Sequence, residues 1–205
     1  AVMLIKRVAL IPLSANEFSF HYIGRCINEF HCAGVKARPQ LIQLPWNNFP
    51  RTFIDNLEKN HRWQEVKSFL NTCTPTLDGP KVVSHNDIHA GNLQIANNKV
   101  IFLDMDEVCY SSRLNDLGMV IANFWDNGRI DAGSVRKNSE ELLYGYDGEH
   151  KMTSGDLEEL LLYALHKLYF TEAYYRFISD IKQQNHGAFI SELIKKEGVI
   201  KDMLS

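Results

Sequence analysis

Residues 85–92, with the sequence His-Asn-Asp-Ile-His-Ala-Gly-Asn, decide how this chain is interpreted. They follow the apolar pair 82–83, and a second apolar run ends at Asp104, twelve residues past the end of this stretch. Carboxylate and amide oxygens are the ligands that Mg²⁺ prefers, so Asn92 and Asp104 indicate a magnesium site. Asp87 lies in the polar loop after the first apolar run, where a carboxylate can accept a proton from a hydroxyl group.

The spacing H-x-D-x-x-x-x-N, followed by a strand that ends in aspartate, is the order of the catalytic and metal loops in kinase-like phosphotransferases. Phosphoryl transfer needs the attacking hydroxyl held in line and the growing phosphate charge stabilised. Gly91 permits the backbone turn just before Asn92. We therefore expect Asp87 to face a γ-phosphate and Asn92 to share a metal site with Asp104.

The segment resembles the aminoglycoside phosphotransferase and choline kinase-like family, whose pattern is H-G-D-h-H-x-x-N followed by h-h-D-[FWM]-[DE]. This chain has H-N-D-I-H-A-G-N and then F-L-D-M-D-E. Residues 116–118 match the D-L-G part of the family's next helix, and residues 23–31 are similar to its L-x-x-L-H helix end. The resemblance spans residues 1–126 in order.

The resemblance implies a role for each polar residue of the motif. Asp87 is expected to be the catalytic base, and His85 is expected to stiffen the catalytic loop. Asn92 and Asp104 are expected to bind Mg²⁺ and, together with His89, to lie at the nucleotide. The implied phosphate donor is ATP, used with Mg²⁺, and the implied acceptor is a hydroxyl group.

Departures from protein kinases favour a small-molecule acceptor, such as an aminoglycoside, choline or a sugar. Position 86 is Asn, where regulated protein kinases have Arg. Only eleven residues separate Asp104 from Asp116, and they contain no A-P-E element, which leaves no room for a long activation loop. Asp116 is expected to hold the backbone of the catalytic loop, and Asp106 is a candidate for secondary metal or loop support.

The predicted fold class is α/β (α+β), a protein kinase-like C-terminal lobe. It is mostly helical, with a short β-hairpin carrying the catalytic loop 84–92 and the metal loop 103–107. Residues 1–13 are expected to form the last small-lobe strand and the hinge, and residues 14–205 the helical large lobe. Because the chain has no glycine-rich loop, we expect the N-terminal lobe to be absent from it. Helices are predicted at 14–33, 53–72, 116–126, 134–145, 154–182 and 187–203, and strands at 81–84, 93–96 and 99–103.

The bulk properties of the 205 residues exclude several other classes. The net charge of −3 provides no basic field for nucleic acid or an anionic membrane, so neither is an expected partner. No run approaches 18 apolar residues, and the first residues lack the order of a signal peptide. The four cysteines form no C-x-x-C pair, which favours reduced thiols in a cytoplasmic protein.

The residues of the motif also fit other interpretations. The chain is alternatively a catalytically inactive, kinase-like binding lobe. H-x-D-x-H at 85–89 is also compatible with a metal-dependent hydrolase, and D-x-D at 104–106 with a nucleotide-sugar transferase. The simplest interpretation without a functional site places these carboxylates in a turn and at a helix cap. A pocket for the acceptor is predicted from residues near the carboxy-terminal helices, namely Trp125, Asp126, Tyr169, Glu172 and Tyr175.

Overall fold

The computed structural model describes residues 11–12, 19–37, 41, 50–72, 81–96, 99–124, 130–148 and 153–205. Its helices are α1 (Phe20–Ala37), α2 (Arg51–Lys59), α3 (Trp63–Thr72), α4 (Arg113–Asn123), α5 (Ala132–Asp147), α6 (Ser154–Lys182) and α7 (Gly187–Leu204). Its strands are β1 (Ile11–Pro12), β2 (Lys81–Ser84), β3 (Leu93–Ala96), β4 (Lys99–Phe102) and β5 (Cys109–Ser112).

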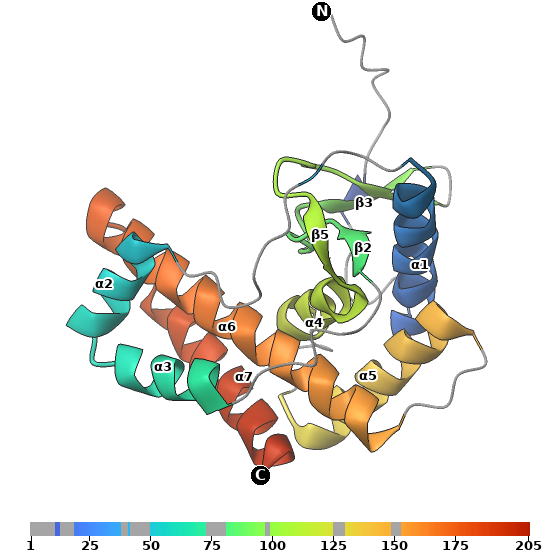
Figure 1. Ribbon diagram of the computed structural model, residues 1–205. Coiled ribbons are helices and arrows are strands. Elements are labelled where there is room, and N and C mark those ends of the chain that lie inside the picture. The colour runs from blue at the N-terminus through green and yellow to red at the C-terminus, as the bar shows by residue number, and fades with distance from the viewer. Residues whose placement is uncertain are drawn as a thin grey trace, which may run out of the picture.

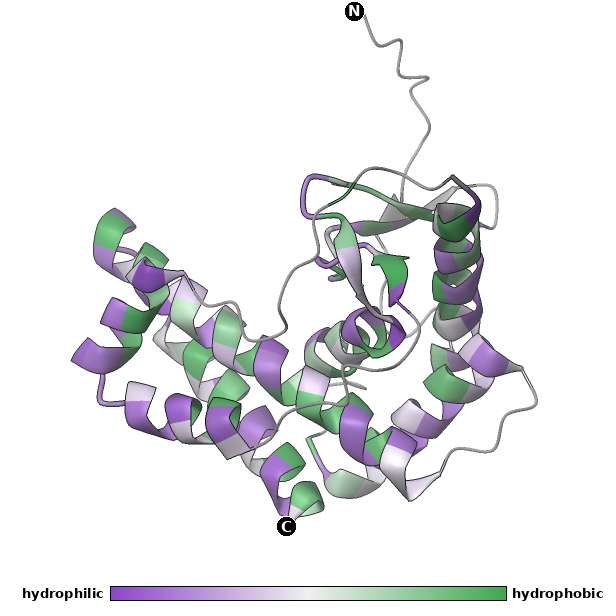
Figure 2. Ribbon diagram, viewed as in Figure 1, coloured by the Kyte–Doolittle hydropathy of each residue, from purple (hydrophilic) through white to green (hydrophobic). Residues whose placement is uncertain are grey.

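Helix α4 lies in the middle of the molecule, with the strands above it in the view of Figure 1. Helices α1 and α5 pack on each other on one side, and the long helix α6 crosses α4 on the other. Helices α2 and α7 pack against α6. Polar and apolar residues alternate along the long helices (Figure 2), as expected for helices with one buried side. None of the described helices has the length and apolar character needed to cross a bilayer.

Two small antiparallel sheets surround the 85–92 motif. Strand β2, which enters the motif, pairs with β5 so that Ser84 lies opposite Cys109. Strands β3 and β4 form the predicted hairpin, and β1 pairs with the outer edge of β3. Strand β5 was not predicted, because its sequence Cys-Tyr-Ser-Ser shows little apolar alternation and its partner is distant in sequence.

The predicted helices are confirmed, with shifts at their ends. Helix α6 has the predicted bounds 154–182, and Thr153 and Asp156 form a capping box at its start. The predicted 53–72 segment is two helices, α2 and α3, with His61 between them at a φ of 57°. Helix α1 spans Phe20–Ala37, and residues 14–18 of the predicted helix lie outside the described residues. The predicted hinge lies outside the described residues except for β1.

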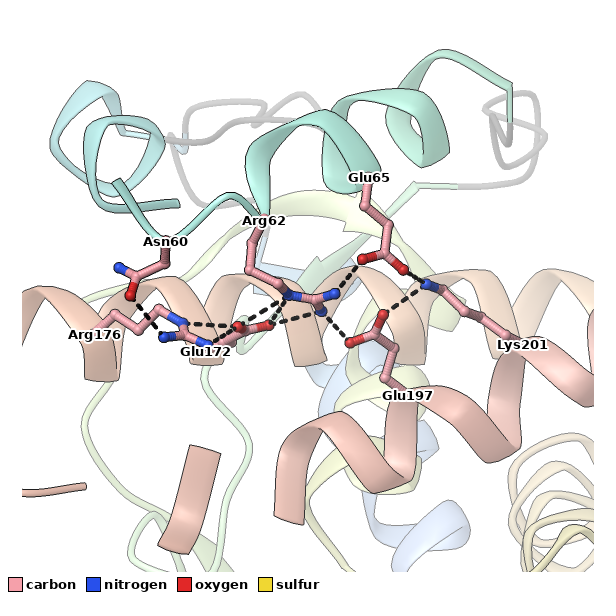
Figure 3. A network of polar contacts seen from close by, with 7 residues as sticks. All are labelled: Asn60, Arg62, Glu65, Glu172, Arg176, Glu197 and Lys201. Atoms are coloured by element: carbon pink, nitrogen blue, oxygen red, sulfur yellow. Dashed lines mark hydrogen bonds and ion pairs between the residues drawn. The ribbon is translucent and has the colours of Figure 1, made fainter. Parts of the chain in front are cut away.

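A network of ion pairs joins α2 and α3 to the carboxy-terminal helices (Figure 3). Arg62, between α2 and α3, contacts Glu172 of α6 at 3.0 Å and also pairs with Glu197 of α7. Arg176 provides Glu172 with a second cation at 2.7 Å, and Lys201 does the same for Glu197 at 2.7 Å. Because both glutamates are buried, each needs these cations to offset its lost hydration.

Candidate active site

The backbone of the loop 84–92 is held by one buried carboxylate, that of Asp116. Asp116, in the first turn of α4, is 0% exposed. Its Oδ2 accepts the backbone N–H of His85 at 2.7 Å, and its Oδ1 accepts that of Asn86 at 2.9 Å. The hydroxyl of Ser84 also donates to Oδ1, at 2.8 Å. The expectation that Asp116 holds the backbone of this loop is confirmed.

Helix α1 supplies a buried partner of this carboxylate. His31 is buried, and its Nε2 donates to Oδ2 of Asp116 at 2.9 Å, while its Nδ1 accepts the Tyr146 hydroxyl at 2.7 Å. Burial by itself raises the pKa of Asp116, but the hydrogen bonds from His31 and from the loop N–H groups lower it below the ordinary value. The carboxylate thus stays ionised and able to accept all four donors.

Asn86 is the first point where the loop leaves ordinary backbone geometry. Its φ is 65°, in the left-handed region that asparagine tolerates better than most residues. Its side-chain oxygen accepts from Nδ2 of Asn115 at 3.0 Å. Further along, Nδ2 of Asn123 donates to the carbonyl of Ile88 at 2.7 Å. Two α4 asparagines that the sequence did not single out therefore fix the shape of the loop.

His85 connects this loop to the predicted metal loop. Its Nδ1 accepts the N–H of Asp87 at 3.3 Å, and its Nε2 donates to the carbonyl of Leu103 at 2.7 Å. The N–H of Leu103 in turn donates to the carbonyl of Asn92 at 2.9 Å. Leu103 therefore aligns the two loops and sets Asp104, at a φ of 56° and exposed, next to the Asn92 backbone.

These contacts do not support the hydrolase interpretation of H-x-D-x-H. Both ring nitrogens of buried His85 are occupied by protein groups, so neither is available to a metal. Among the described residues, no three His, Cys, Asp or Glu side chains gather closely enough to hold a metal ion. The predicted stiffening role of His85 is consistent with its burial and its two hydrogen bonds.

The two carboxylate oxygens of Asp87 face different partners. Oδ2 accepts from Nδ2 of Asn92 at 2.9 Å and lies 3.5 Å from Nε2 of His89. Oδ1 lies 3.5 Å from Nζ of Lys167. The N–H of Gly91 donates to Nδ1 of His89 at 3.0 Å, which leaves the Nε2 side of the ring facing Asp87. His89, with a further contribution from Lys167, lowers the pKa of Asp87 to about 2.

Lys167 reaches the site because α6 approaches α4 closely. Gly118, the glycine of the D-L-G element, faces Tyr163, and a Cβ added there would lie 2.5 Å from the Tyr163 Cβ. No larger residue fits this crossing without moving a helix. Lys167 lies one helical turn after Tyr163, which brings its side chain beside the 84–92 loop. Sequence reasoning missed Lys167, since it lies eighty positions after Asp87.

A cleft of about 920 Å³ opens beside Asp87, and it is lined both by Lys167, at Oδ1 of Asp87, and by His89, at Oδ2. The cleft is lined by residues of the 84–92 loop, β5, α4 and α6. Asp106 and Glu107 add two acidic side chains to its lining. Asn92 and Asp104 are not among the lining residues. The aromatic part of its wall consists of Phe53, Phe170, Tyr174, Tyr175 and Phe189.

The residues predicted for an acceptor pocket do not all line this cleft. Tyr175 lines it. Tyr169 and Glu172 do not, because they lie on the opposite side of α6: Tyr169 packs against Phe69, and Glu172 is held in the ion-pair network of Figure 3. Trp125 and Asp126 lie outside the described residues.

Residues 19–149 match the model of the phosphotransferase enzyme family, APH. The chain belongs to this phosphotransferase family. The matched region runs from the start of α1 to the end of α5 and so contains the 84–92 loop, the hairpin and Asp116. No curated protein sequence matches the chain.

Solved structures of phosphotransferases share the fold at low sequence identity. The amicoumacin kinase hAmiN, solved with AMP-PNP, Ca²⁺ and Ami, is 15% identical with a TM-score of 0.67, covering 96% of this chain and 63% of its own. The choline kinase LicA from Streptococcus pneumoniae is 11% identical with a TM-score of 0.63, covering 95% and 67%. A choline/ethanolamine kinase family protein from Mesorhizobium loti is 13% identical with a TM-score of 0.60, covering 96% and 66%. The chain thus spans about two thirds of these structures' length.

Proposed function

We propose that this phosphotransferase family member carries the large lobe of an ATP- and Mg²⁺-dependent kinase that phosphorylates a hydroxyl group of a small molecule. Asp87 is the base that accepts the hydroxyl proton, and Asn92 and Asp104 are the metal ligands. His85 and Asp116 hold the loop. His89 orients Asp87 beside the nucleotide.

The position of Asp87 between two different environments carries the proposal. Asp87 lines the open cleft together with Lys167, whose Nζ lies 3.5 Å from its Oδ1. On its Oδ2 side lies Asn92, whose backbone is joined through Leu103 to Asp104. An acceptor in the cleft and a phosphate donor at the Asn92 side would therefore meet at one carboxylate, as in-line transfer requires.

The donor groups at Asn92 and Asp104 fit a hard divalent cation. The amide NH₂ of Asn92 donates to both the carbonyl and the Oδ2 of Asp87, at 3.0 Å and 2.9 Å, so its oxygen is the end left for a metal. Asp104 adds a carboxylate, and this residue is exposed to solvent. Mg²⁺ held by such oxygens would neutralise negative charge on the phosphates of the nucleotide. hAmiN, which shares the fold, was solved with a nucleotide analogue and Ca²⁺.

The cleft supports a small-molecule acceptor. Its volume of about 920 Å³ lies within the range of sites for small ligands. Aromatic side chains of α2 and α6 form one wall, and Phe53 packs edge-on against Phe170 with ring centroids 5.1 Å apart. The structural relatives include kinases of amicoumacin and choline, which are both small molecules.

Transfer of label from γ-³²P-ATP tests this function directly. With Mg²⁺ and a panel of aminoglycosides, aminoalcohols and sugars, we expect the purified protein to label at least one alcohol and to release ADP in equal amount. Label transfer should stop when EDTA removes the metal. Nucleotide binding without any transfer, across the panel and to water, would instead favour the inactive binding lobe.

A further inference from the structure

Helix α6 brings a largely buried cation, Lys167, next to Asp87. The Lys167 side chain is 13% exposed, and its Nζ lies 3.5 Å from Oδ1 of Asp87. Nζ also lies 5.5 Å from the centroid of the Phe170 ring. Burial lowers the pKa of Lys167, and the neighbouring Asp87 opposes that shift.

The hydrogen-bonding capacity of this ammonium exceeds what the protein around it provides. An ammonium carries three donors, and a tight bond to a carboxylate measures about 2.8 Å. The Asp87 contact is longer than that, at 3.5 Å. Within the described ranges, no other carboxylate lies within 4 Å of Nζ. Lys167 therefore faces the cleft with donor directions left for an anion that a ligand brings.

We propose that Lys167 binds the phosphoryl group as it passes from the nucleotide to the acceptor. The proposal rests on the proposed function and adds a phosphate-binding residue on the acceptor side of Asp87. An acceptor hydroxyl that donates to Oδ1 must lie about 3 Å from the γ-phosphorus. Since Nζ is already 3.5 Å from Oδ1, the equatorial phosphoryl oxygens fall within its reach.

The transfer step assigns Lys167 no proton and no electrons. The acceptor oxygen forms a bond to the γ-phosphorus, and its proton passes to Asp87. The bond between the γ-phosphorus and the β,γ-bridging oxygen breaks, and its electron pair leaves with that oxygen on ADP. Lys167 stays an ammonium throughout and offsets the negative charge on the equatorial oxygens.

Electrostatics gives a reason for a cation at this position. Asp87 is ionised at neutral pH, so it repels the phosphate that must approach it. A cation beside Oδ1 reduces this repulsion on the cleft side, where Asp106 and Glu107 add further negative charge. Lysine suits the role because it contacts phosphate as a compact point charge.

Substitution of Lys167 by methionine tests the proposal, because methionine is similar in length, uncharged and tolerant of burial. Lys167→Arg keeps the charge, and Lys195→Met changes an exposed lysine of α7 as the matched control. Each variant is checked by thermal unfolding. The measured quantities are kcat, the KM for ATP, and the affinities for Mg-ADP alone and for Mg-ADP with aluminium fluoride, which mimics the transferring phosphoryl group.

We expect Lys167→Met to lower kcat by about 10²–10³-fold and to weaken aluminium fluoride binding to a similar extent. The affinity for Mg-ADP alone should not change, and Lys167→Arg should retain more activity than Lys167→Met. A kcat within about threefold of wild type overturns the proposal. So does a lower kcat with undiminished aluminium fluoride binding, because Lys167 then acts only on Asp87. If wild type neither transfers phosphate nor binds nucleotide, the proposed function fails as well.

Discussion

Replacing Asp87 by asparagine is expected to lower kcat for phosphoryl transfer by about 10²–10⁴-fold, the range associated with loss of a general base. Asparagine has the same shape but does not accept the hydroxyl proton. The Asn92 amide still has an oxygen to donate to at this position, so the loop should keep its conformation. Affinity for the Mg-nucleotide should stay within about threefold of wild type.

The matched control is Asp202→Asn, which removes an exposed carboxylate from α7 far along the chain from the loop. Both variants are compared by steady-state kinetics and by calorimetric titration with AMP-PNP. Undiminished turnover by Asp87→Asn would remove Asp87 from its proposed role. A loss of nucleotide affinity equal to the loss of kcat would point to a structural defect instead.

Replacing Asp116 by alanine is expected to destabilise the fold by about 2–6 kcal/mol, because each of the two loop N–H groups left without its acceptor costs about 1–3 kcal/mol. The change leaves the N–H groups of His85 and Asn86 buried without their acceptor. It also leaves His31 without the carboxylate. Chemical denaturation measures the effect, and Asp116→Asn, which keeps one acceptor oxygen, should cost less.

Asp55→Ala is the control, because the Asp55 side chain is 46% exposed and pairs, within the described part of the chain, with Arg51 across the surface of α2. Such a pair contributes about 0–1 kcal/mol. The contribution of Asp116 should also depend on pH. Since its folded pKa is lowered, its stabilisation is complete above the unfolded value of about 3.9 and is lost as pH falls toward the folded value. Equal losses for Asp116→Ala and Asp55→Ala would contradict this account.

The shape of the 84–92 loop was predictable because its contacts are local in sequence. Asn92 reaches Asp87 across five residues, and the hairpin returns the chain to Asp104 within a short distance. Residue types there match their chemistry closely, so one loop and one strand were enough to propose base and metal ligands. Asp116 contacts the loop from 31 positions after His85, and its role was predicted from its place in the D-L-G element and not from local contacts.

The walls of the cleft were not predictable, because they depend on how distant helices cross. Lys167 and Glu172 lie on the same apolar-rich helix, and the sequence gives no indication which one faces Asp87. The close approach of α4 and α6 at Gly118 sets which side of α6 faces Asp87. Lys167 therefore lies at the cleft, and Glu172 lies at Arg62. Strand β5 was not predicted for a similar reason, since its pairing with β2 joins segments that are distant in sequence.

Binding of AMP-PNP with and without Mg²⁺, to wild type and to Asp104→Asn, tests most directly that the Asn92 side of Asp87 holds a metal–nucleotide complex. Isothermal titration calorimetry gives each affinity. We expect Mg²⁺ to strengthen binding to wild type by about tenfold or more and to have little effect on Asp104→Asn. Equal affinity with and without Mg²⁺ in wild type, or an undiminished Mg²⁺ effect in Asp104→Asn, would contradict the account.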